Sequence, residues 1–327
     1  MTKSVACAVA AALPLVFAGC GKDSTTGPGN VTDIQVQATG FPALSQGDGV
    51  FELWISFARL SPSPPGLRHS TAASAGRFRV DAGGKFVSET GAPMVFAVDP
   101  ASDRVTKLTN GKIAWQVAED SFVTWEPVND PELDDPNLPA IIAGSFLNGK
   151  ATLTTGGDDA LRTDFATLAG SFCLATPTTT SSSDETDGVW FAAPGGASAS
   201  LTLATLPAGW TYQGWITRAT STSSLGVFTL ADGADADSSG PTVAGQDHAG
   251  YAFPGSDFPT GAAGVDLRPG TVFVTVEPPE GADGAGPSFL RVLSASLSAA
   301  QAPGAAVPLA RMSAFPTLEI TIPPPNS

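Results

Sequence analysis

The chain has 327 residues, of which 42% are hydrophobic and 14% are charged, and its formal net charge is −15. This negative charge repels nucleic-acid phosphates, and no cluster of Lys and Arg interrupts it, so nucleic acid is excluded as an expected partner. The length is sufficient for two domains, and the 36 glycines and 28 prolines favour a turn-rich β protein over long helices.

Residues 1–19 are predicted to form a lipoprotein signal peptide. Lys3 precedes the apolar stretch SVACAVAAALPLVF, which is too short to anchor stably across a bilayer. The residues Phe17-Ala18-Gly19-Cys20 resemble the lipobox of bacterial lipoproteins, in which signal peptidase II cleaves before a cysteine that becomes lipidated. We therefore expect a lipid on Cys20 and a flexible tether over 20–29. The alternative is an ordinary secretory signal with a chance cysteine.

Lipidation at Cys20 implies a location in the cell envelope, because three fatty chains attach a protein permanently to a membrane. Gly21 stands where an aspartate would favour inner-membrane retention, so by the sorting habit of enteric bacteria we expect the outer membrane, at its periplasmic or surface face. With Cys7 removed and Cys20 acylated, Cys173 remains alone and no internal disulfide is expected. Its apolar surroundings, GSFCLATP, predict a buried, inert thiol.

Three landmarks occur twice in the same order. FELWI (51–55) corresponds to YQGWI (212–216), Gly76-Arg77-Phe78 to Gly226-Val227-Phe228, and FVTWEP (122–127) to FVTVEP (273–278). The separation from glycine to glutamate is 50 residues in the first copy (126 − 76) and 51 in the second (277 − 226). The extra length of the first copy falls in SPSPPGLRHSTAASA, which has the composition of a surface loop. The spacing predicts two homologous domains in tandem.

The landmarks are short apolar or alternating runs rich in Val, Ile, Thr, Phe and Trp, which predict strands. We expect an all-β chain with two tandem antiparallel β-sandwich domains, of immunoglobulin-like general architecture, after the signal peptide. The first repeat is placed at 30–162, the second at 163–299, and an Ala/Pro-rich tail at 300–327, where LEITI (318–322) would add an edge strand. Trp54 and Trp215 are expected to anchor the two cores.

Several weaker patterns complete the predicted elements. A strand is expected at 113–117, and Leu161, Phe165 and Leu168 have helical spacing that favours one short helix within 158–170. KATLT (150–154) loosely matches SASLS (294–298) as a downstream part of the repeat. The polar loop 178–188 is expected to be an exposed, mobile hairpin connection.

With these motifs together, both copies resemble the extracytoplasmic domain of anti-sigma-K-type factors. That family has a Y-E-x-W-[ILV] strand, a G-x-F strand opening and a V-T-V-E-P strand before a loop rich in Gly, Pro and Asp. The resemblance covers most of residues 30–299 and implies a bacterial lipoprotein with two such domains. The cytoplasmic sigma-binding segment and membrane helix of the family are not expected before this lipobox, so the regulatory activity is not carried over with the domain.

Few residues are candidates for catalysis or metal binding. Glu126 and Glu277 could act as an acid–base pair, but their equivalent positions in separate repeats favour a structural role at a strand end. Two acidic loops carry oxygen ligands suited to Ca²⁺, without the EF-hand pattern, and solvated turns are the favoured interpretation. The weak Ca²⁺ candidates are Asp130, Asp134, Asp135, Asp232, Asp235 and Asp237. His69, His248 and Cys173 do not supply a zinc set.

These patterns predict a non-enzymatic, lipid-anchored cell-envelope protein with a binding or structural role, no catalytic residues and no cofactor. Its expected partners are the membrane, through the lipid on Cys20, and an envelope protein. One alternative is an extracytoplasmic sensor or partner in anti-sigma-type envelope signalling. Another is a carbohydrate-active hydrolase, which would need two carboxylates that converge in a cleft.

Overall fold

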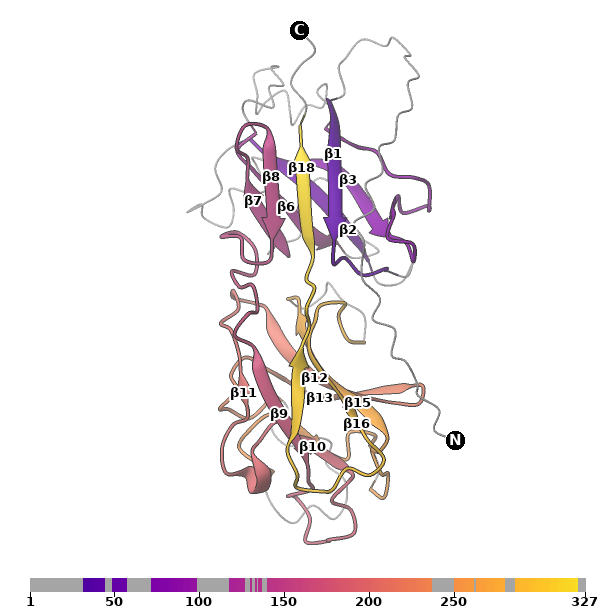
Figure 1. Ribbon diagram of the computed structural model, residues 1–327, viewed down its shortest axis with the longest axis vertical. Helices are drawn as coiled ribbons and strands as arrows, with labels where there is room; N and C mark the ends of the chain where they lie inside the picture. Colours follow the sequence, from indigo (N-terminus) through magenta and orange to yellow (C-terminus); the bar gives the residue numbers. More distant parts are fainter. Residues whose placement is uncertain are drawn as a thin grey trace, which may run out of the picture. The chain divides into compact units, whose positions relative to one another are not determined.

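The computed structural model (Figure 1) describes residues 32–44, 49–57, 72–98, 118–126, 130, 133, 135–136, 140–236, 250–261, 263–279 and 286–322. In these residues every regular element is a strand except η2 (Pro194–Gly196), a single 3-10 turn. Residues 31–327 form one compact unit. The predicted strand at 113–117 lies outside the described residues. The chain is all-β, as the sequence predicts.

The strands form two large sheets in which all neighbours are antiparallel. The first sheet has the order β4 (Phe86–Val87), β3 (Ala72–Val80), β2 (Val50–Ser56), β6 (Asp120–Glu126), β7 (Ile142–Ser145), β8 (Lys150–Thr154), β18 (Thr317–Thr321), β1 (Thr32–Thr39), β5 (Phe96–Val98). The second has the order β13 (Ser221–Phe228), β12 (Thr211–Arg218), β15 (Gly270–Glu277), β16 (Arg291–Leu297), β17 (Val307–Arg311), β9 (Ala169–Leu174), β10 (Gly188–Trp190), β14 (Gly255–Asp257), and β11 (Leu201–Thr202) also pairs with β9.

Each sheet folds over so that strands distant in its order meet across a core. In the first sheet the ring of Phe78 on β3 contacts that of Phe96 on β5, with centroids 5.3 Å apart. In the second, the Gly255 N–H on β14 donates to the Asp235 carboxylate, just after β13, over 3.0 Å. Two layers held in this way are β-sandwiches, so the expected pair of tandem sandwich domains is confirmed.

The repeated landmarks occupy the same places in both sheets. FELWI lies in β2 and FVTWEP in β6, while YQGWI lies in β12 and FVTVEP in β15. The registers agree, because Trp54 is opposite Phe122 and Trp215 is opposite Phe273. The neighbouring pairing, β2 with β3 and β12 with β13, has an irregularity beside the tryptophan in both copies.

That shared irregularity explains the repeated glycine. Gly76 and Gly226 lie where the register shifts, with φ of 136° and 107°, which side chains rarely tolerate. In each copy the glycine N–H donates to a serine hydroxyl two residues earlier, Ser74 or Ser224, at 3.2 and 3.1 Å. The G-x-F motif therefore marks a bulge within β3 and within β13, and not the start of a strand.

The tail does not provide an edge strand. LEITI does form a strand, β18, but this strand lies inside the first sheet, paired with β8 on one side and β1 on the other (Figure 1). The preceding tail strand, β17, pairs with β16 and β9 of the second sheet. A segment that follows both repeats in sequence thus contributes to each sheet. The boundaries proposed at 162/163 and 299/300 remain predictions, although β18 belongs by pairing with the first repeat.

Two weaker expectations are wrong. KATLT and SASLS are not equivalent: SASLS lies in β16, beside β15, whereas the strand beside β6 is β7, and KATLT forms β8 one place further on. Residues 158–168 form successive turns in place of a helix. Arg162 and Phe165 have φ of 59° and 58°, which a right-handed helix excludes. The large apolar residues of this segment are nevertheless buried, namely Leu161, Phe165 and Leu168. Their helical spacing therefore arises because successive turns direct these side chains into the core.

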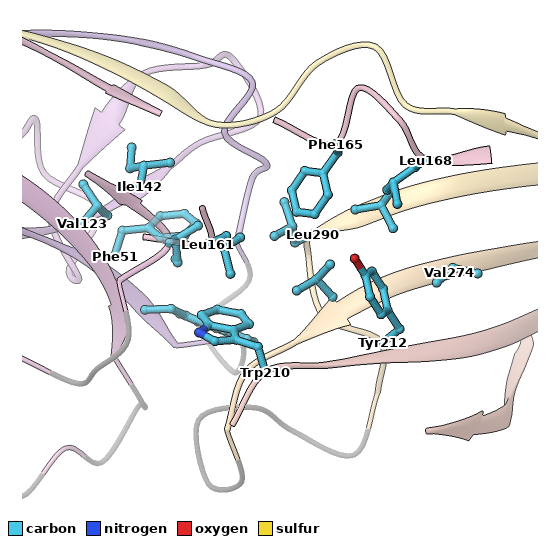
Figure 2. Packing of buried hydrophobic residues seen from close by; sticks show 14 of the residues in the cluster. Phe51, Val123, Ile142, Leu161, Phe165, Leu168, Trp210, Tyr212, Val274 and Leu290 are labelled. Carbon is cyan, nitrogen blue, oxygen red and sulfur yellow. The ribbon is translucent and has the colours of Figure 1, made fainter. Parts of the chain in front are cut away.

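The two tryptophans are core residues, as expected. Trp54 is 0% exposed and Trp215 is 5% exposed. The largest cluster of buried hydrophobic side chains, part of which Figure 2 shows, includes Phe51 and Val123 together with Tyr212 and Val274. Trp54 lies outside it, stacked on Phe122 with centroids 6.3 Å apart. Both faces of β2 are therefore buried, and all seven of its residues are buried, including the polar Glu52 and Ser56.

Candidate functional site

The glutamate of each repeated phrase belongs to a hydrogen-bonded series of three side chains. In the first repeat the Trp54 indole N–H donates to the Thr124 hydroxyl over 2.9 Å, and that hydroxyl donates to Glu126. In the second, the Trp215 indole N–H donates to the Thr275 hydroxyl over 2.8 Å, and that hydroxyl donates to Glu277. We call each series a Trp–Thr–Glu network.

These networks are inside the sandwiches. Glu126 is 0% exposed and Glu277 is 4% exposed, and each belongs to a different sheet. Glu277 also accepts from the Ser288 backbone N–H over 3.2 Å. The Trp–Thr bonds join β2 to β6 and β12 to β15, and each glutamate accepts from the threonine of its own strand. Each network therefore gives the buried indole N–H and the hydroxyl group hydrogen-bond partners. The geometry fits the structural role expected for the Glu-Pro phrase, and the two carboxylates do not meet at one site.

The first repeat carries a cluster of ionisable residues whose two central members are replaced by uncharged residues in the second. Arg77 on β3 contacts three carboxylates: Nη1 is 3.4 Å from Glu52 and 3.0 Å from Asp130, and Nε is 2.6 Å from Glu89. Glu52 on β2 also accepts from the Ser74 hydroxyl over 2.5 Å. We call Arg77, Glu52, Glu89 and Asp130 the Arg77 cluster. It joins the loop after β6 to β3 and to the turn after β4.

Glu52 is the unusual member, because it is 1% exposed. Burial raises the pKa of its carboxyl group to about 8, and the nearby Glu126 and Asp130 act in the same direction, while Ser74 and Arg77 oppose the shift. Glu52 is thus mostly protonated at neutral pH and gains charge in mildly alkaline solution. The arrangement can hold and release a proton.

The corresponding position in the second repeat is neutral. Gln213 replaces Glu52 in the aligned phrase, and its Nε2 donates to the Ser224 hydroxyl over 2.8 Å. Val227 replaces Arg77. The bulge serine is therefore used in both copies, as a donor to a carboxyl group in one and as an acceptor from an amide in the other. Sequence comparison of the copies contains this difference, but only the geometry shows that the substituted residues touch.

A second acidic group lies in the second repeat. Asp257 on β14 is 0% exposed and accepts from the Trp190 indole N–H over 2.6 Å, and from the backbone N–H and hydroxyl of Thr178 over 2.9 and 2.5 Å. Burial raises the pKa of Asp257. Near the other end of the same loop, Asp187 accepts from the Gly264 N–H over 2.6 Å. The loop 178–188 is therefore attached at both ends, while Thr180, Ser182 and Ser183 between them are exposed. Its mobility stays a prediction.

Cys173 on β9 is a free, fully buried thiol. Burial raises its pKa to about 11, and the nearby Glu185 adds to the shift, so the thiol stays protonated at neutral pH. Its register partner is Trp190 on β10. This environment agrees with an inert thiol that packs in the core.

The calcium candidates that the structure describes do not converge on one site. Asp130 pairs with Arg77, Asp235 accepts from the Gly255 N–H, and Asp232 is exposed. Asp134 and Asp237 lie outside the described residues, as do Cys20, His69 and His248. Among the described residues no three His, Cys, Asp or Glu side chains form a group that could hold a metal ion. Asp130 and Asp235 serve instead to attach loops to strands.

One hollow lies in the second repeat, next to the start of β12. It has a volume of about 320 Å³ and is lined by residues 203–210 and 229–231, including Leu203, Leu206, Trp210 and Leu230. Trp210 is 4% exposed, and its indole N–H has no hydrogen-bond acceptor in the described structure. The lining offers apolar contact and no pair of acid and base.

No known protein family, curated protein or solved structure matches this chain. Within the described residues there is also no helix with the length and hydrophobicity needed to cross a bilayer. The resemblance to anti-sigma-K-type outer domains therefore stays a prediction from the strand motifs.

Proposed function

We propose that this is a non-enzymatic, lipid-anchored protein of the cell envelope with a binding or structural role. The observation that carries the proposal is the burial of Glu126 and Glu277 in separate Trp–Thr–Glu networks. The carboxylates that would be the first choice for catalysis accept hydrogen bonds from buried hydroxyl groups inside the sandwiches. General acid–base catalysis needs groups within reach of a substrate, and buried groups in different sandwiches do not meet that need.

The lipid anchor is the part of the proposal that rests on the lipobox at Cys20. Growth with a fatty-acid analogue should label the protein, and Cys20→Ala should abolish the label and move the protein out of the membrane fraction. Cys173→Ala is the matched control, because that thiol is buried and should leave labelling unchanged. Equal labelling of the Cys20→Ala variant would contradict lipidation at this residue.

The binding role is tested by affinity capture of the anchored protein from its own envelope, followed by mass spectrometry. A reproducible envelope protein recovered with the native chain, and not with the same chain after heat denaturation, would support binding. Repeated recovery of the chain alone would favour the structural role. The signalling alternative requires capture of a membrane-spanning regulator, and its present support is limited to strand motifs whose shared residues have packing roles.

A further inference from the structure

The strand β18 occupies an unusual position for its place in the sequence. It follows the second repeat, yet it pairs with β8 and β1 of the first. Residue 317 comes 163 positions after the end of β8 (317 − 154). A short connecting loop would lower the entropy cost of bringing β18 to β8, but no such loop joins them. The pairing therefore depends on how well β18 fits between β1 and β8.

The fit is extensive on both sides. Residues 317–321 are in register with Thr39 to Gln35 of β1 and with Thr154 to Lys150 of β8. The Ile322 N–H then donates to the Gly149 carbonyl over 2.8 Å. An interior strand has its backbone groups paired in two directions, which is the arrangement by which a sheet binds an extended peptide.

The side chains of the segment alternate in the manner of such a peptide. Leu318, Ile320 and Ile322 are 0%, 1% and 7% exposed, whereas Glu319 between them is exposed. Leu318 lies opposite Leu153 on one side and Ala38 on the other. The buried residues supply most of the free energy that holds the segment in the sheet, because each large aliphatic side chain contributes roughly 1.5–3 kcal/mol when fully buried. They also determine which side chains the site selects.

The rest of the first sheet depends on this segment. In the described residues, β1 pairs with β18 and β5 alone, so hydrogen bonding connects the β1–β5 pair to β8 through β18. Without the segment, β1 and β8 would face each other with unpaired backbone edges. Unpaired edges of this kind readily accept another strand.

The connection to β18 is accessible. Met312, Ser313 and Ala314 are exposed, between the end of β17 and the start of β18. Phe315 follows, with its ring 4.9 Å from that of Phe165, and its carbonyl lies against Gly40, where a Cβ atom would come within 2.2 Å. The exposed residues can be cut or extended, while Phe315 and the strand stay in place.

We propose that the space between β1 and β8 is a strand-binding site that holds residues 317–322 of its own chain and accepts the same segment from a second copy. Exchange between two copies would join them by a symmetric swap, since each would donate the segment that it receives. The proposal is independent of the lipid anchor and of any envelope ligand.

The test uses the full chain with a protease site in place of residues 312–314, cut after folding. The released segment should remain bound to the folded protein through gel filtration. An excess of a fluorescent peptide with residues 315–322 should then replace it, and Leu318→Asp with Ile320→Asp in that peptide should weaken binding by at least about tenfold, because two charges would enter the core. Glu319→Gln is the matched control and should bind like the native peptide.

Two results would overturn the proposal. One is immediate loss of the cut segment with unchanged amide exchange in β1 and β8, because the sheet would then not need an occupant. The other is equal binding of the native and the doubly charged peptides, because the site would then not select the alternating side chains of the segment.

Discussion

The two repeats agree in their packing and differ in their charge. Both have a tryptophan opposite a phenylalanine, a bulge glycine with positive φ, and a Trp–Thr–Glu network. In the first copy the residue two before the tryptophan is a buried glutamate in the Arg77 cluster, and in the second it is a glutamine bonded to a serine. The shared residues pack the two sandwiches, and the unlike residues place ionisable groups at these positions in the first copy alone.

Among the residues that both copies share, the two tryptophans should contribute most to stability. Trp54→Ala and Trp215→Ala should each lower the free energy of unfolding by about 3–5 kcal/mol, because each removes a buried ring. We expect the larger loss for Trp54, which is more buried and stacks on Phe122. Urea denaturation of both variants measures this. A loss under about 1 kcal/mol at either site would show that the copies do not share a core anchor.

Removal of the network hydroxyl should have a smaller effect that is unequal between the copies. Thr124→Val leaves the Trp54 indole N–H without this acceptor, at a cost of about 1–3 kcal/mol. Thr275→Val should cost less, because the Trp215 indole N–H also lies 3.4 Å from a Glu277 oxygen. Thr→Ser at each site keeps the hydroxyl and is the control. Urea denaturation should rank Thr124→Val below Thr275→Val in stability, and the reverse order would refute the networks as described.

Introduction of the first copy's buried carboxyl group into the second should destabilise the second. Gln213→Glu places a carboxyl group beside Ser224, with Val227 where the first copy has Arg77. We expect a loss of about 1–2 kcal/mol at pH 7, because the buried carboxyl group keeps a proton that the unfolded chain releases, and recovery below pH 5, where the unfolded chain binds the proton as well. Urea denaturation at both pH values measures this, with Gln213→Asn as a control. A loss that is equal at pH 5 and pH 7 would contradict an electrostatic origin.

Replacement of Glu52 in the first copy by the glutamine of the second should alter the pH dependence of stability. Since the pKa of Glu52 is raised in the folded protein from 4.5 to about 8, the folded state keeps a proton that the unfolded state has lost, and stability falls as pH rises from about 4.5 to 8. Glu52→Gln should remove this contribution, which is at most about 1.4 kcal/mol per pH unit. Thermal unfolding from pH 5 to pH 9 checks it. Parallel pH profiles of variant and native protein would contradict the shifted pKa.

The sequence predicts the strands and the duplication well because both are recorded in local patterns. FVTWEP and FVTVEP are strands at equivalent places, and Trp54 and Trp215 are buried as expected. The position of β18 was not predictable, since the alternation of LEITI specifies a strand but not the strands beside it. The helix over 158–170 failed because buried turn residues reproduced helical spacing. The Arg77 cluster was missed because its members are far apart in sequence and meet only through strand pairing.

The most direct test of the duplicated network is hydrogen exchange at the six tryptophan indole N–H groups, followed by NMR after ¹⁵N labelling. The indole resonances of Trp54 and Trp215, assigned with Trp→Phe variants, should both be strongly protected. Thr124→Val should reduce protection of Trp54 and leave Trp215 unchanged, and Thr275→Val should do the opposite. Exchange of either native indole at the rate of an exposed group would contradict a Trp–Thr–Glu network built twice into this chain.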